Sequence, residues 1–517
     1  GVMASNQWVA IENEDAGEDD EPEHYWYYFQ ANGKALTNGD NDKVSLKTIN
    51  GKKYAFDDEG KMLYGWVDED SAERVDDTDS DGFKEGVYYF GGEDDGAMTT
   101  GWLQLDITYD EATNDDYKYT AAAFNDDEDQ TRWFYFKSNG KKIFAEDGDR
   151  TKDKTINGKK YAFDQYGAMV AEWSLDEDDL GTNPNAFTSN VASSAEVITG
   201  KAFDSKYTES WKYFNSVEDG ARVSKGWFKV VPAEYLNEDK YNDDEDFWYY
   251  ADGSGNLYAG EFKTIKGKKY AFRNDGRMLD GLKFIKEDAD NQSLSVYADD
   301  DDTWNFDNED DFLDHAAKFY EPEGYKCFYF GDGDDGAMRT NKTNVEIDGE
   351  NHNFYFEKSG GNKGAGVTGE EDDKLYQSGM LLKADSDDKY IVVEKTTHVN
   401  ADGKAEYSTY RKLDDAKEFM NAEGVVVKDE LDGKNGNEAV NIGNGNTKKA
   451  EDLSEAYSIT YKTEANSKGD KKEYILVNTS GKIVDGKGKN KDGSDYYYVT
   501  EKKANGENSI VAIYVED

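Results

Sequence analysis

The chain has 517 residues, of which 36% are hydrophobic and 14% aromatic, with 37 tyrosines and 25 phenylalanines. Its formal net charge of −51 repels phosphate backbones and anionic membrane surfaces, which argues against nucleic-acid binding and membrane insertion. The single cysteine, Cys327, excludes an intrachain disulfide, and no apolar run approaches membrane-spanning length.

Repeats begin at Tyr25, after an acidic lead over residues 1–24. One stretch, KTINGKKYAFDDEGKMLYGW in its first copy, starts at Lys47 and returns at Lys154 and Lys263, so successive copies are 107 and 109 residues apart. Each copy holds an aromatic run, a turn that ends in glycine and a second apolar run, which is the pattern of a β-hairpin. Self-similarity at a nearly fixed period predicts one hairpin unit stacked many times.

Shorter aromatic runs fill the spaces between these copies. A WYYF hairpin, a KKYAF hairpin and a YYF–DDGAM hairpin follow one another, and this triplet recurs roughly three times over residues 25–383. Long acidic inserts are expected to emerge as loops, and they cover residues 68–86, 103–132, 174–210, 229–247 and 283–326. Within the last insert, Asn308–Tyr320 is predicted as a short helix that Asn308 caps.

The strict pattern fades after Lys383, and residues 384–517 are predicted as a separate β-rich region that caps the stacked hairpins. We therefore predict an all-β fold with three parts, residues 1–24, 25–383 and 384–517. Its central part is a β-solenoid of stacked aromatic hairpins with long acidic insert loops. In the last part we expect a helical turn at Leu413–Met420 and strands at Tyr390–Val393, Tyr474–Val477, Tyr496–Val499 and Ile510–Val515.

Side chains alternate between the two faces of a strand. When the runs are aligned on the turn glycine, one face is aromatic in nearly every copy, as with Tyr27 and Phe29, and we assign it to the core. The opposite face changes from Trp26 in one copy to Lys53 and Ala55 in another. A face that tolerates such changes is not an obligatory core, so we expect it to be available for binding.

The recurring order of Gly-Trp, Trp-Tyr-Tyr-Phe, Gly-x-Met and Gly-Trp resembles the cell-wall-binding (choline-binding) repeats of Gram-positive surface proteins. The INGKKYAF variant is closer to the related repeats of glucan-binding proteins and of the receptor-binding regions of large clostridial toxins. The resemblance covers residues 25–383 and implies a β-solenoid in a secreted or cell-surface protein. It also implies ligands: quaternary ammonium groups between rings in the choline-binding branch, and sugars stacked on rings in the other branches.

The resemblance further implies which side chains line the sites, because each cage of the family holds the Trp after Gly, an outer ring of the next hairpin and a methionine. Carried onto this sequence, the candidate rings are Trp66 with Tyr89; Trp102 with Trp133 and Tyr135; Trp173 with Trp211 and Tyr213; and Trp227 with Trp248 and Tyr250, supported by Met62, Met98 and Met169. Leu282 and Asn341 stand where the Gly-Trp tryptophan is expected, so those repeats depart from the pattern.

No residue pattern indicates catalysis, and no cofactor is expected. The four histidines are scattered, and Cys327 is interpreted as a free surface or semi-buried thiol. Asp77, Asp79 and Asp81 match the opening half of a calcium loop. A bidentate acid is required at the twelfth position, where Tyr88 stands, so a solvated acidic turn is favoured over a calcium site.

Three hypotheses for function remain open. The leading one is a non-catalytic, exported binding protein that attaches to cell-wall polymers, such as choline-bearing teichoic acid, or to glycans, through repeated weak aromatic sites. The second is a structural stalk or adhesin whose repeats are scaffold and whose inserts make protein contacts. The third is the binding portion of a cell-wall hydrolase whose catalytic domain lies elsewhere.

Overall fold

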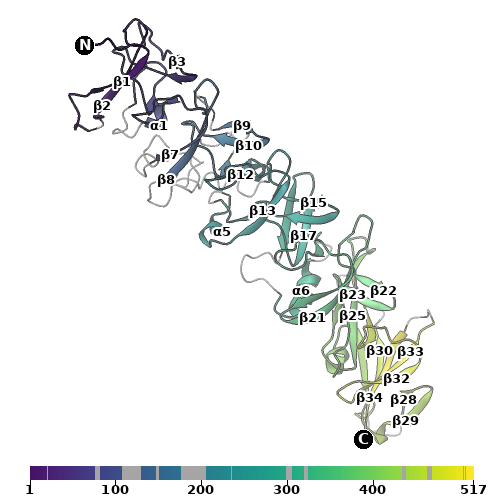
Figure 1. Cartoon of the computed structure of the whole chain (residues 1–517). Helices are drawn as coiled ribbons and strands as arrows, with labels where there is room; N and C mark the ends of the chain where they lie inside the picture. Colours follow the sequence, from purple (N-terminus) through teal and green to yellow (C-terminus); the bar gives the residue numbers. More distant parts are fainter. Residues whose placement is uncertain are drawn as a thin grey trace. The chain divides into compact units, whose positions relative to one another are not determined.

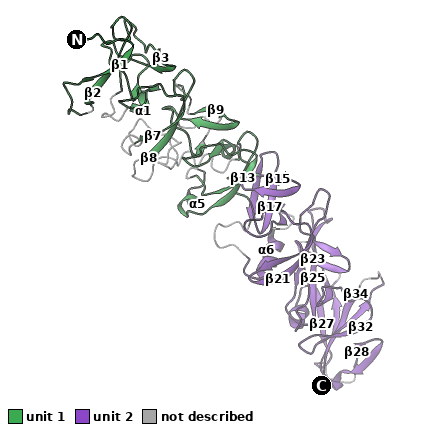
Figure 2. Ribbon diagram, in the orientation of Figure 1, with its two compact units in different colours: residues 1–260, 274–278 green, residues 261–273, 279–517 purple. Residues whose placement is uncertain are grey.

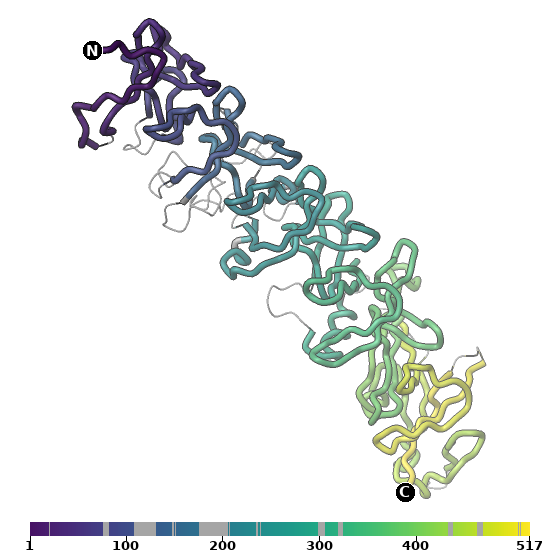
Figure 3. Tube along the Cα trace, in the orientation of Figure 1, coloured from purple at the N-terminus to yellow at the C-terminus, as the bar shows by residue number. Residues whose placement is uncertain are grey.

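The computed structural model describes residues 1–19, 21–75, 82–107, 130–146, 149, 151–175, 205–233, 236–297, 306–319, 324–432, 438–462, 469–504, 506 and 508–517 (Figure 1). The chain divides into two compact units (Figure 2). Unit 1 holds residues 1–260 and 274–278, and unit 2 holds residues 261–273 and 279–517. The Cα trace can be followed from one hairpin into the next within each unit (Figure 3).

Every sheet described in unit 1 has two antiparallel strands, so the unit is a succession of small hairpins. Its strands are β1 (Gln7–Glu12), β2 (His24–Phe29), β3 (Lys47–Ile49), β4 (Lys52–Tyr54), β5 (Trp66–Val67), β6 (Tyr88–Tyr89), β7 (Gly101–Ile107), β8 (Gln130–Phe136), β9 (Lys152–Ile156), β10 (Lys159–Phe163), β11 (Glu172–Leu175), β12 (Trp211–Phe214), β13 (Gly226–Val230) and β14 (Phe247–Ala251). Its short helices are α1 (Gly82–Glu85), α4 (Ser205–Glu209) and α5 (Glu238–Asn242).

Unit 2 combines further hairpins with larger sheets, of strand order β18-β17-β19, β20-β21-β24-β23-β22, β26-β25-β31 and β27-β30-β34-β33-β32. Its strands are β15 (Glu261–Ile265), β16 (Lys268–Phe272), β17 (Leu282–Asp288), β18 (Ser293–Tyr297), β19 (Lys326–Tyr329), β20 (Asn341–Ile347), β21 (Glu350–Phe356), β22 (Gly369–Glu371), β23 (Lys374–Gln377), β24 (Met380–Leu381), β25 (Tyr390–Val399), β26 (Ala405–Lys412), β27 (Val425–Asp429), β28 (Ala439–Gly443), β29 (Asn446–Lys449), β30 (Leu453–Tyr461), β31 (Lys471–Asn478), β32 (Gly488–Lys491), β33 (Tyr497–Lys502) and β34 (Asn508–Glu516). Its helices are α6 (Glu309–Phe319), α7 (Ala416–Met420) and the 3-10 turn η4 (Ala450–Asp452).

These elements confirm an all-β fold built from many small antiparallel sheets. The predicted helix near Asn308 is α6, and the Asn308 carboxamide accepts a hydrogen bond from the amide of Asp311 at 2.9 Å. The predicted helical turn is α7, capped by Asp415. The four predicted C-terminal strands lie in β25, β31, β33 and β34. Among the residues that the structure describes, no helix is long and apolar enough to cross a membrane.

The aromatic runs pair differently from the expectation. The sequence predicted that each run pairs mainly with the apolar run after its turn glycine, but only single bridges form there, such as Phe56 with Met62 and Phe163 with Met169. The longer pairing of an aromatic run is with the strand that precedes it in the sequence. The Gly-Trp strand β7 pairs with β8 over seven residue pairs, from Gly101 opposite Phe136 to Ile107 opposite Gln130. An acidic insert therefore joins the two strands of one hairpin.

The KKYAF hairpins use a second kind of turn. In β3–β4 the two turn residues, Asn50 and Gly51, both have positive φ, at 49° and 83°. Two positive φ values define a type I′ turn, whose twist matches that of the flanking strands, and Asn-Gly is its preferred sequence. The same geometry recurs at Asn157–Gly158 and at Lys266–Gly267.

Backbone hydrogen bonds join successive hairpins. The amide of Met62 donates to the carbonyl of Trp26 at 2.8 Å, and the amide of Met169 donates to the carbonyl of Trp133 at the same distance. Both donors occupy the Gly-x-Met position, two residues after the turn glycine. The same link recurs from Met98 to Lys53, Lys142 to Val87, Arg222 to Lys160, Met278 to Trp248, Met338 to Lys269 and Gly366 to Cys327, at 2.7–2.9 Å. A backbone link to an earlier hairpin is thus a repeated feature of these copies.

The predicted core face is buried in most copies. Its second ring is at most 1% exposed in Phe56, Phe90, Phe136, Phe163, Phe272, Phe330 and Phe356. In the first hairpin the two faces do not differ, because Trp26, Tyr27, Tyr28 and Phe29 are all half-buried. The prediction that the opposite face is available was wrong for several copies, since Ala55, Ala162, Ala271, Cys327 and Trp211 are buried. A small alanine lets the neighbouring hairpin pack close on that side.

Candidate functional site

The candidate rings meet in the groups that the sequence suggested. Strand register places the tryptophan after glycine directly opposite a tyrosine of the aromatic run, in the pairs Trp66–Tyr89, Trp102–Tyr135, Trp173–Tyr213 and Trp227–Tyr250. Each pair of rings lies edge to face, with centroids 5.1–5.3 Å apart. Such aromatic pairs contribute roughly 0.5–1.5 kcal/mol beyond the area they bury.

The most complete group is the Trp102 box, formed by Trp102, Trp133, Tyr135, Tyr161 and Met169. The Trp102 and Trp133 ring planes are 88° apart with centroids at 6.2 Å, so they form two walls of a corner. Tyr161, from the next hairpin, lies 4.9 Å from Trp102. Met169 is buried beneath the rings, which are themselves only half-buried. The box therefore presents ring surface to solvent on a packed floor.

A carboxylate stands at the rim of the Trp102 box. Glu218 lies in the turn of a later hairpin and accepts a hydrogen bond from Nε1 of Trp133 at 3.5 Å. Nε2 of Gln104, on β7, lies 3.4 Å from both carboxylate oxygens of Glu218. Ring faces carry negative potential, and a nearby carboxylate adds to it, so this corner attracts cations.

A second copy, the Trp8 box, was missed by the sequence analysis. It is formed by Trp8, Trp26, Tyr28, Tyr54 and Met62. Trp8 lies 5.2 Å from Tyr28 and 4.9 Å from Tyr54, both edge to face, as Trp102 does with Tyr135 and Tyr161. Trp8 lacks a preceding glycine and lies in the residues 1–24 that were assigned to an acidic lead, where the structure has strand β1. The available signal was Trp26, which precedes Trp133 by 107 residues.

The Trp8 box has its own rim carboxylate. Asp94 Oδ1 accepts a hydrogen bond from Trp26 Nε1 at 2.8 Å and lies 2.9 Å from His24 Nε2. These hydrogen bonds, that of Trp26 first, lower the pKa of the Asp94 carboxyl and favour its charged form. Asp94 and Glu218 both stand two residues before a turn glycine, Gly96 and Gly220, so the rim acid is a repeated feature.

Two of the predicted groups hold a buried tryptophan. Trp66 is 7% exposed and packs 5.2 Å from Phe134, and the ammonium of Lys142 lies 5.1 Å from its ring. Trp211 is 3% exposed, and Trp173, which contacts it at 6.1 Å, uses its Nε1 to donate to the carbonyl of Val231 at 2.8 Å. Trp66 and Trp211 therefore pack in the interior, whereas Trp173 and Tyr213 stay half-buried.

The fourth group is half-exposed. Trp227 lies 6.3 Å from Trp248, with ring planes 87° apart, and 5.1 Å from Tyr250. This corner repeats the geometry of Trp102 and Trp133. The Met278 amide donates to the Trp248 carbonyl at 2.8 Å, as Met169 does to Trp133.

The candidate methionines pack against the turn of the following hairpin. A Cβ added to Gly96 would lie 2.5 Å from Met62 Sδ, and one added to Gly140 would lie 2.3 Å from Met98 Sδ. Met98 is half-buried against Ala55 and Leu63 rather than in a ring box. The turn glycines are thus required by close approach of a methionine from the hairpin before.

Three other expectations can be compared with the structure. The calcium-loop residues Asp77, Asp79 and Asp81 lie outside the described residues, and the described part of the chain places no group of three potential ligands to hold a metal. Cys327 is 1% exposed, and burial raises the pKa of its thiol, so it is neither a surface nor a semi-buried thiol.

The third expectation was that Asn341 stands in the tryptophan position of its repeat, and the structure corrects it. Register aligns it with Phe356, the place of the glycine, and puts Lys342 opposite Tyr355 in the tryptophan position.

No family model matches this chain. A sequence relative is glucosyltransferase-S of Streptococcus mutans, 25% identical over 285 residues; the match covers 50% of this chain but only 16% of that protein. The chain thus spans about one sixth of this relative's length.

Solved structures that match include the modular autolysin LytC of Streptococcus pneumoniae in complex with a synthetic peptidoglycan ligand, at 15% identity, covering 80% of this chain and 58% of that chain, with a TM-score of 0.29. CbpJ of the same organism matches at 17% identity, 73% and 100% coverage and a TM-score of 0.25. Choline-binding protein F of the same organism matches at 16% identity, 73% and 86% coverage and a TM-score of 0.22. Choline-binding proteins are thus among the matches, as the resemblance of the repeats led us to expect.

Proposed function

We propose that this chain is a non-catalytic binding protein, secreted or on the cell surface, that attaches to cell-wall polymers or glycans through aromatic boxes. The observation that carries the proposal is the repetition of one arrangement in the Trp8 and Trp102 boxes. Each has half-exposed rings set at steep angles over a buried methionine, and a rim carboxylate bonded to the outer tryptophan. We further propose that the linked hairpins form a β-solenoid within each unit.

The geometry favours a cationic group on the polymer. A quaternary ammonium such as that of choline gains from ring faces at roughly 0.5–2 kcal/mol per contact, and it cannot use a hydrogen bond. A carboxylate at 2.8–3.5 Å from the ring nitrogen supplies a counter-charge without occupying the ring face. Each box alone is expected to bind weakly, and boxes engaged on one polymer would gain by effective concentration.

Calorimetric titration of the full chain with choline, and separately with α-glucan oligosaccharides, tests the proposal. Trp26→Ala combined with Trp133→Ala should weaken binding at least tenfold, while Tyr497→Ala, a ring on β33 outside the boxes, should leave it unchanged. No heat from either ligand at millimolar concentration, with the chain folded by circular dichroism, would refute the binding function.

The rim acids distinguish the two ligand classes. Asp94→Asn combined with Glu218→Gln keeps the rings and removes both counter-charges. Affinity for choline should then fall several-fold, whereas affinity for a neutral glucan should not change. A loss for both ligands alike would indicate that these acids only position Trp26 and Trp133.

Two alternatives remain. In a structural stalk or adhesin, both tryptophan variants would lose stability without any ligand ever being bound. The other alternative is the binding portion of a cell-wall hydrolase whose catalytic domain lies elsewhere. The sequence match to a small part of a glucosyltransferase supports its more general form, in which these repeats are the binding portion of a larger enzyme. Sequencing the complete reading frame would separate that case from a free-standing binding protein.

A further inference from the structure

The sign of the charge reverses locally in unit 2, in a chain whose net charge is −51. A cavity of about 340 Å³ is lined by Lys342, Lys374 and Lys383, and no carboxylate is among its described lining residues. A second cavity, of about 610 Å³, is lined by six lysines and four carboxylates. The six lysines are Lys395, Lys462, Lys472, Lys482, Lys502 and Lys503.

The two cavities adjoin where β23 meets the segment that follows β31. Lys374 forms a β-bridge with Lys482, and the Ile483 amide donates to the Asp373 carbonyl at 2.8 Å. Lys374 lines the smaller cavity, while Lys482 and Asp373 line the larger one. We call the nine lysines of both cavities the lysine strip.

The strip begins where the repeat changes its chemistry. In β20 the register puts Lys342 opposite Tyr355, at the position that Trp102 and Trp227 hold opposite their tyrosines. The Lys342 ammonium lies 5.6 Å from the Tyr355 ring and 3.3 Å from Asp372, an exposed carboxylate. A position that supplies an electron-rich ring in earlier hairpins thus supplies a cation here.

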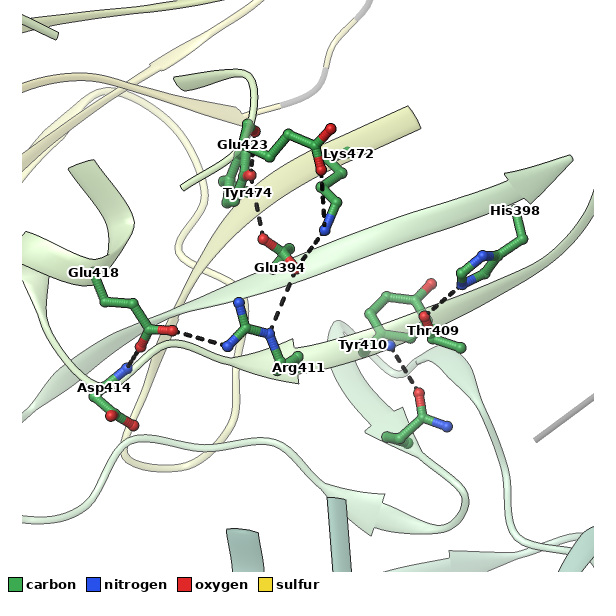
Figure 4. A network of polar contacts seen from close by, with 11 residues as sticks. Glu394, His398, Thr409, Tyr410, Arg411, Asp414, Glu418, Glu423, Lys472 and Tyr474 are labelled. Carbon is green, nitrogen blue, oxygen red and sulfur yellow. Dashed lines mark hydrogen bonds and ion pairs between the residues drawn. The ribbon is translucent and has the colours of Figure 1, made fainter. Parts of the chain in front are cut away.

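Part of the strip is already neutralised within the fold. Nζ of Lys472 lies 2.9 Å from the buried carboxylate of Glu394, which Arg411 and Tyr474 also approach (Figure 4). Lys395 and Lys502 pair with Glu473 and Asp485 at 3.6 and 3.3 Å.

The other lysines of the larger cavity have no such neighbour among the described residues. Lys462, Lys482 and Lys503 are exposed, and no described carboxylate lies within 4.0 Å of their ammonium groups. Lys503 instead lies 5.6 Å from the ring of Tyr461. Three exposed ammonium groups with no acidic partner among the described residues leave a surplus of positive charge around this cavity.

The other polar residues that line the smaller cavity carry amide and hydroxyl groups, which can form hydrogen bonds with the hydroxyls of a ligand. Asn344 and Asn353 offer carboxamides to the smaller cavity, joined by a hydrogen bond of 3.1 Å, and Thr343, Thr479 and Ser480 offer hydroxyls. The rings that line this cavity, Phe354 and Tyr376, are buried and offer no platform on which a nucleic-acid base could stack. Lysine is a compact point charge suited to phosphate or carboxylate.

We propose that the lysine strip binds an anionic saccharide, a sugar residue that bears a phosphate or a carboxylate. The ammonium groups hold the oxyanion, and the amides and hydroxyls hold the sugar. The site is separate from the aromatic boxes and takes a ligand group of opposite charge. Because the rest of the chain repels anions, binding is local and is weakened by salt.

The test is calorimetric titration of the full chain at low ionic strength with glucose 6-phosphate, with a short oligogalacturonate and with neutral glucose oligomers. Binding of either anionic sugar and not of the neutral one is expected, and the preferred ligand identifies which oxyanion the strip selects. Binding of the anionic sugar should weaken at least tenfold in a triple variant of the larger cavity, Lys462→Gln with Lys482→Gln and Lys503→Gln. Binding should also weaken in a double variant of the smaller cavity, Lys342→Gln with Lys383→Gln. Lys449→Gln, an exposed lysine on β29 outside both cavities, is the matched control.

The proposal is overturned if neither anionic sugar binds at low salt, or if the Lys449 variant loses as much affinity as the triple variant. Equal or tighter binding of a single-stranded oligonucleotide of the same charge would overturn the assignment to a saccharide. The anionic sugar should still bind when both aromatic boxes are mutated. That result would show that the lysine strip binds independently of the proposed choline or glucan sites.

Discussion

The ammonium of Lys142 lies 5.1 Å from the ring of Trp66, in the position that methionine holds in the Trp8 and Trp102 boxes. The Lys142 amide makes the same link to the previous hairpin as the methionines do. Its Nζ also donates to the carbonyl of Phe83, and the negative charge of Asp164 acts on it. The Trp66 group is thus an aromatic box filled by a lysine side chain of the chain itself.

This buried lysine predicts a pH dependence of stability. Burial lowers the pKa of Lys142 to about 7, and the Asp164 charge offsets only part of that effect. An unfolded lysine keeps a pKa of about 10.4, so above pH 7 the unfolded chain binds more protons at this site than the folded chain. The free energy of unfolding is therefore expected to rise with pH between about 7 and 10, by at most about 1.4 kcal/mol per unit.

Lys142→Met isolates this effect, because it places at this position the residue found in the other boxes. Urea unfolding of both proteins at several pH values measures the difference, and the titration of other lysines and tyrosines cancels in it. The variant should be the more stable at pH 7, and the advantage should shrink as the pH rises. Parallel profiles for the two proteins would contradict a buried lysine with a lowered pKa.

The open and closed boxes predict opposite effects of the same substitution. Trp66→Ala removes a 7%-exposed ring from a packed core and is expected to cost roughly 3–5 kcal/mol of stability. Trp133→Ala removes a half-buried ring and should cost clearly less while abolishing binding at its box. Thermal unfolding compares the two. Equal losses of stability would mean that Trp133 is also a packing residue.

The turn glycines predict a steric coupling between hairpins. A Cβ on Gly96 would lie 2.5 Å from Met62 Sδ, so Gly96→Ala should cost about 1–3 kcal/mol. The cost should be smaller when Met62→Ala is present, and a double-mutant cycle measures the coupling. Gly92, in the same turn, has open space at its Cβ and provides the control Gly92→Ala. Additive effects in the cycle would argue against the contact.

The cap of α6 predicts a smaller, local effect. Asn308 accepts the amide hydrogen of Asp311 at 2.9 Å, so Asn308→Ala should lower the free energy of unfolding by about 1 kcal/mol. Asp307→Ala is a neighbouring control that leaves this bond intact. If both variants unfold at the same urea concentration, the cap contributes nothing measurable.

The sequence indicated which candidate rings lie together, through the resemblance of its repeats to a known family. The grouping of Trp102 with Trp133 and Tyr135 came from the resemblance of the repeats to a known family, and the structure pairs these residues across an insert, which the sequence analysis did not foresee. Trp8 was missed because Gln7 replaces the expected glycine. The contact of Tyr161 with Trp102 was also missed, since it depends on how one hairpin packs against the next, which a periodic pattern alone does not specify.

The closed boxes could have been found with the same alignment. Two residues after the turn glycine the sequence reads Met62, Met98, Lys142 and Met169, so Lys142 is visible as an exception. Its consequence was not visible, because whether a lysine turns inward depends on the carbonyls and rings that surround it. The burial of Trp211 likewise depends on Tyr207, which precedes it by only four residues but belongs to helix α4.

The amide links between hairpins have a consequence for how such a chain changes length. The link from Met169 to Trp133 reproduces the link from Met62 to Trp26 exactly one block of 107 residues later, with the same residue types at both ends. If one whole block were removed or duplicated, each hairpin would still follow a hairpin of the same type as before and could pack against it in the same way. Removing a single hairpin would instead set a bulky tryptophan where an alanine allows close packing, so viable variants in length should differ by complete triplets.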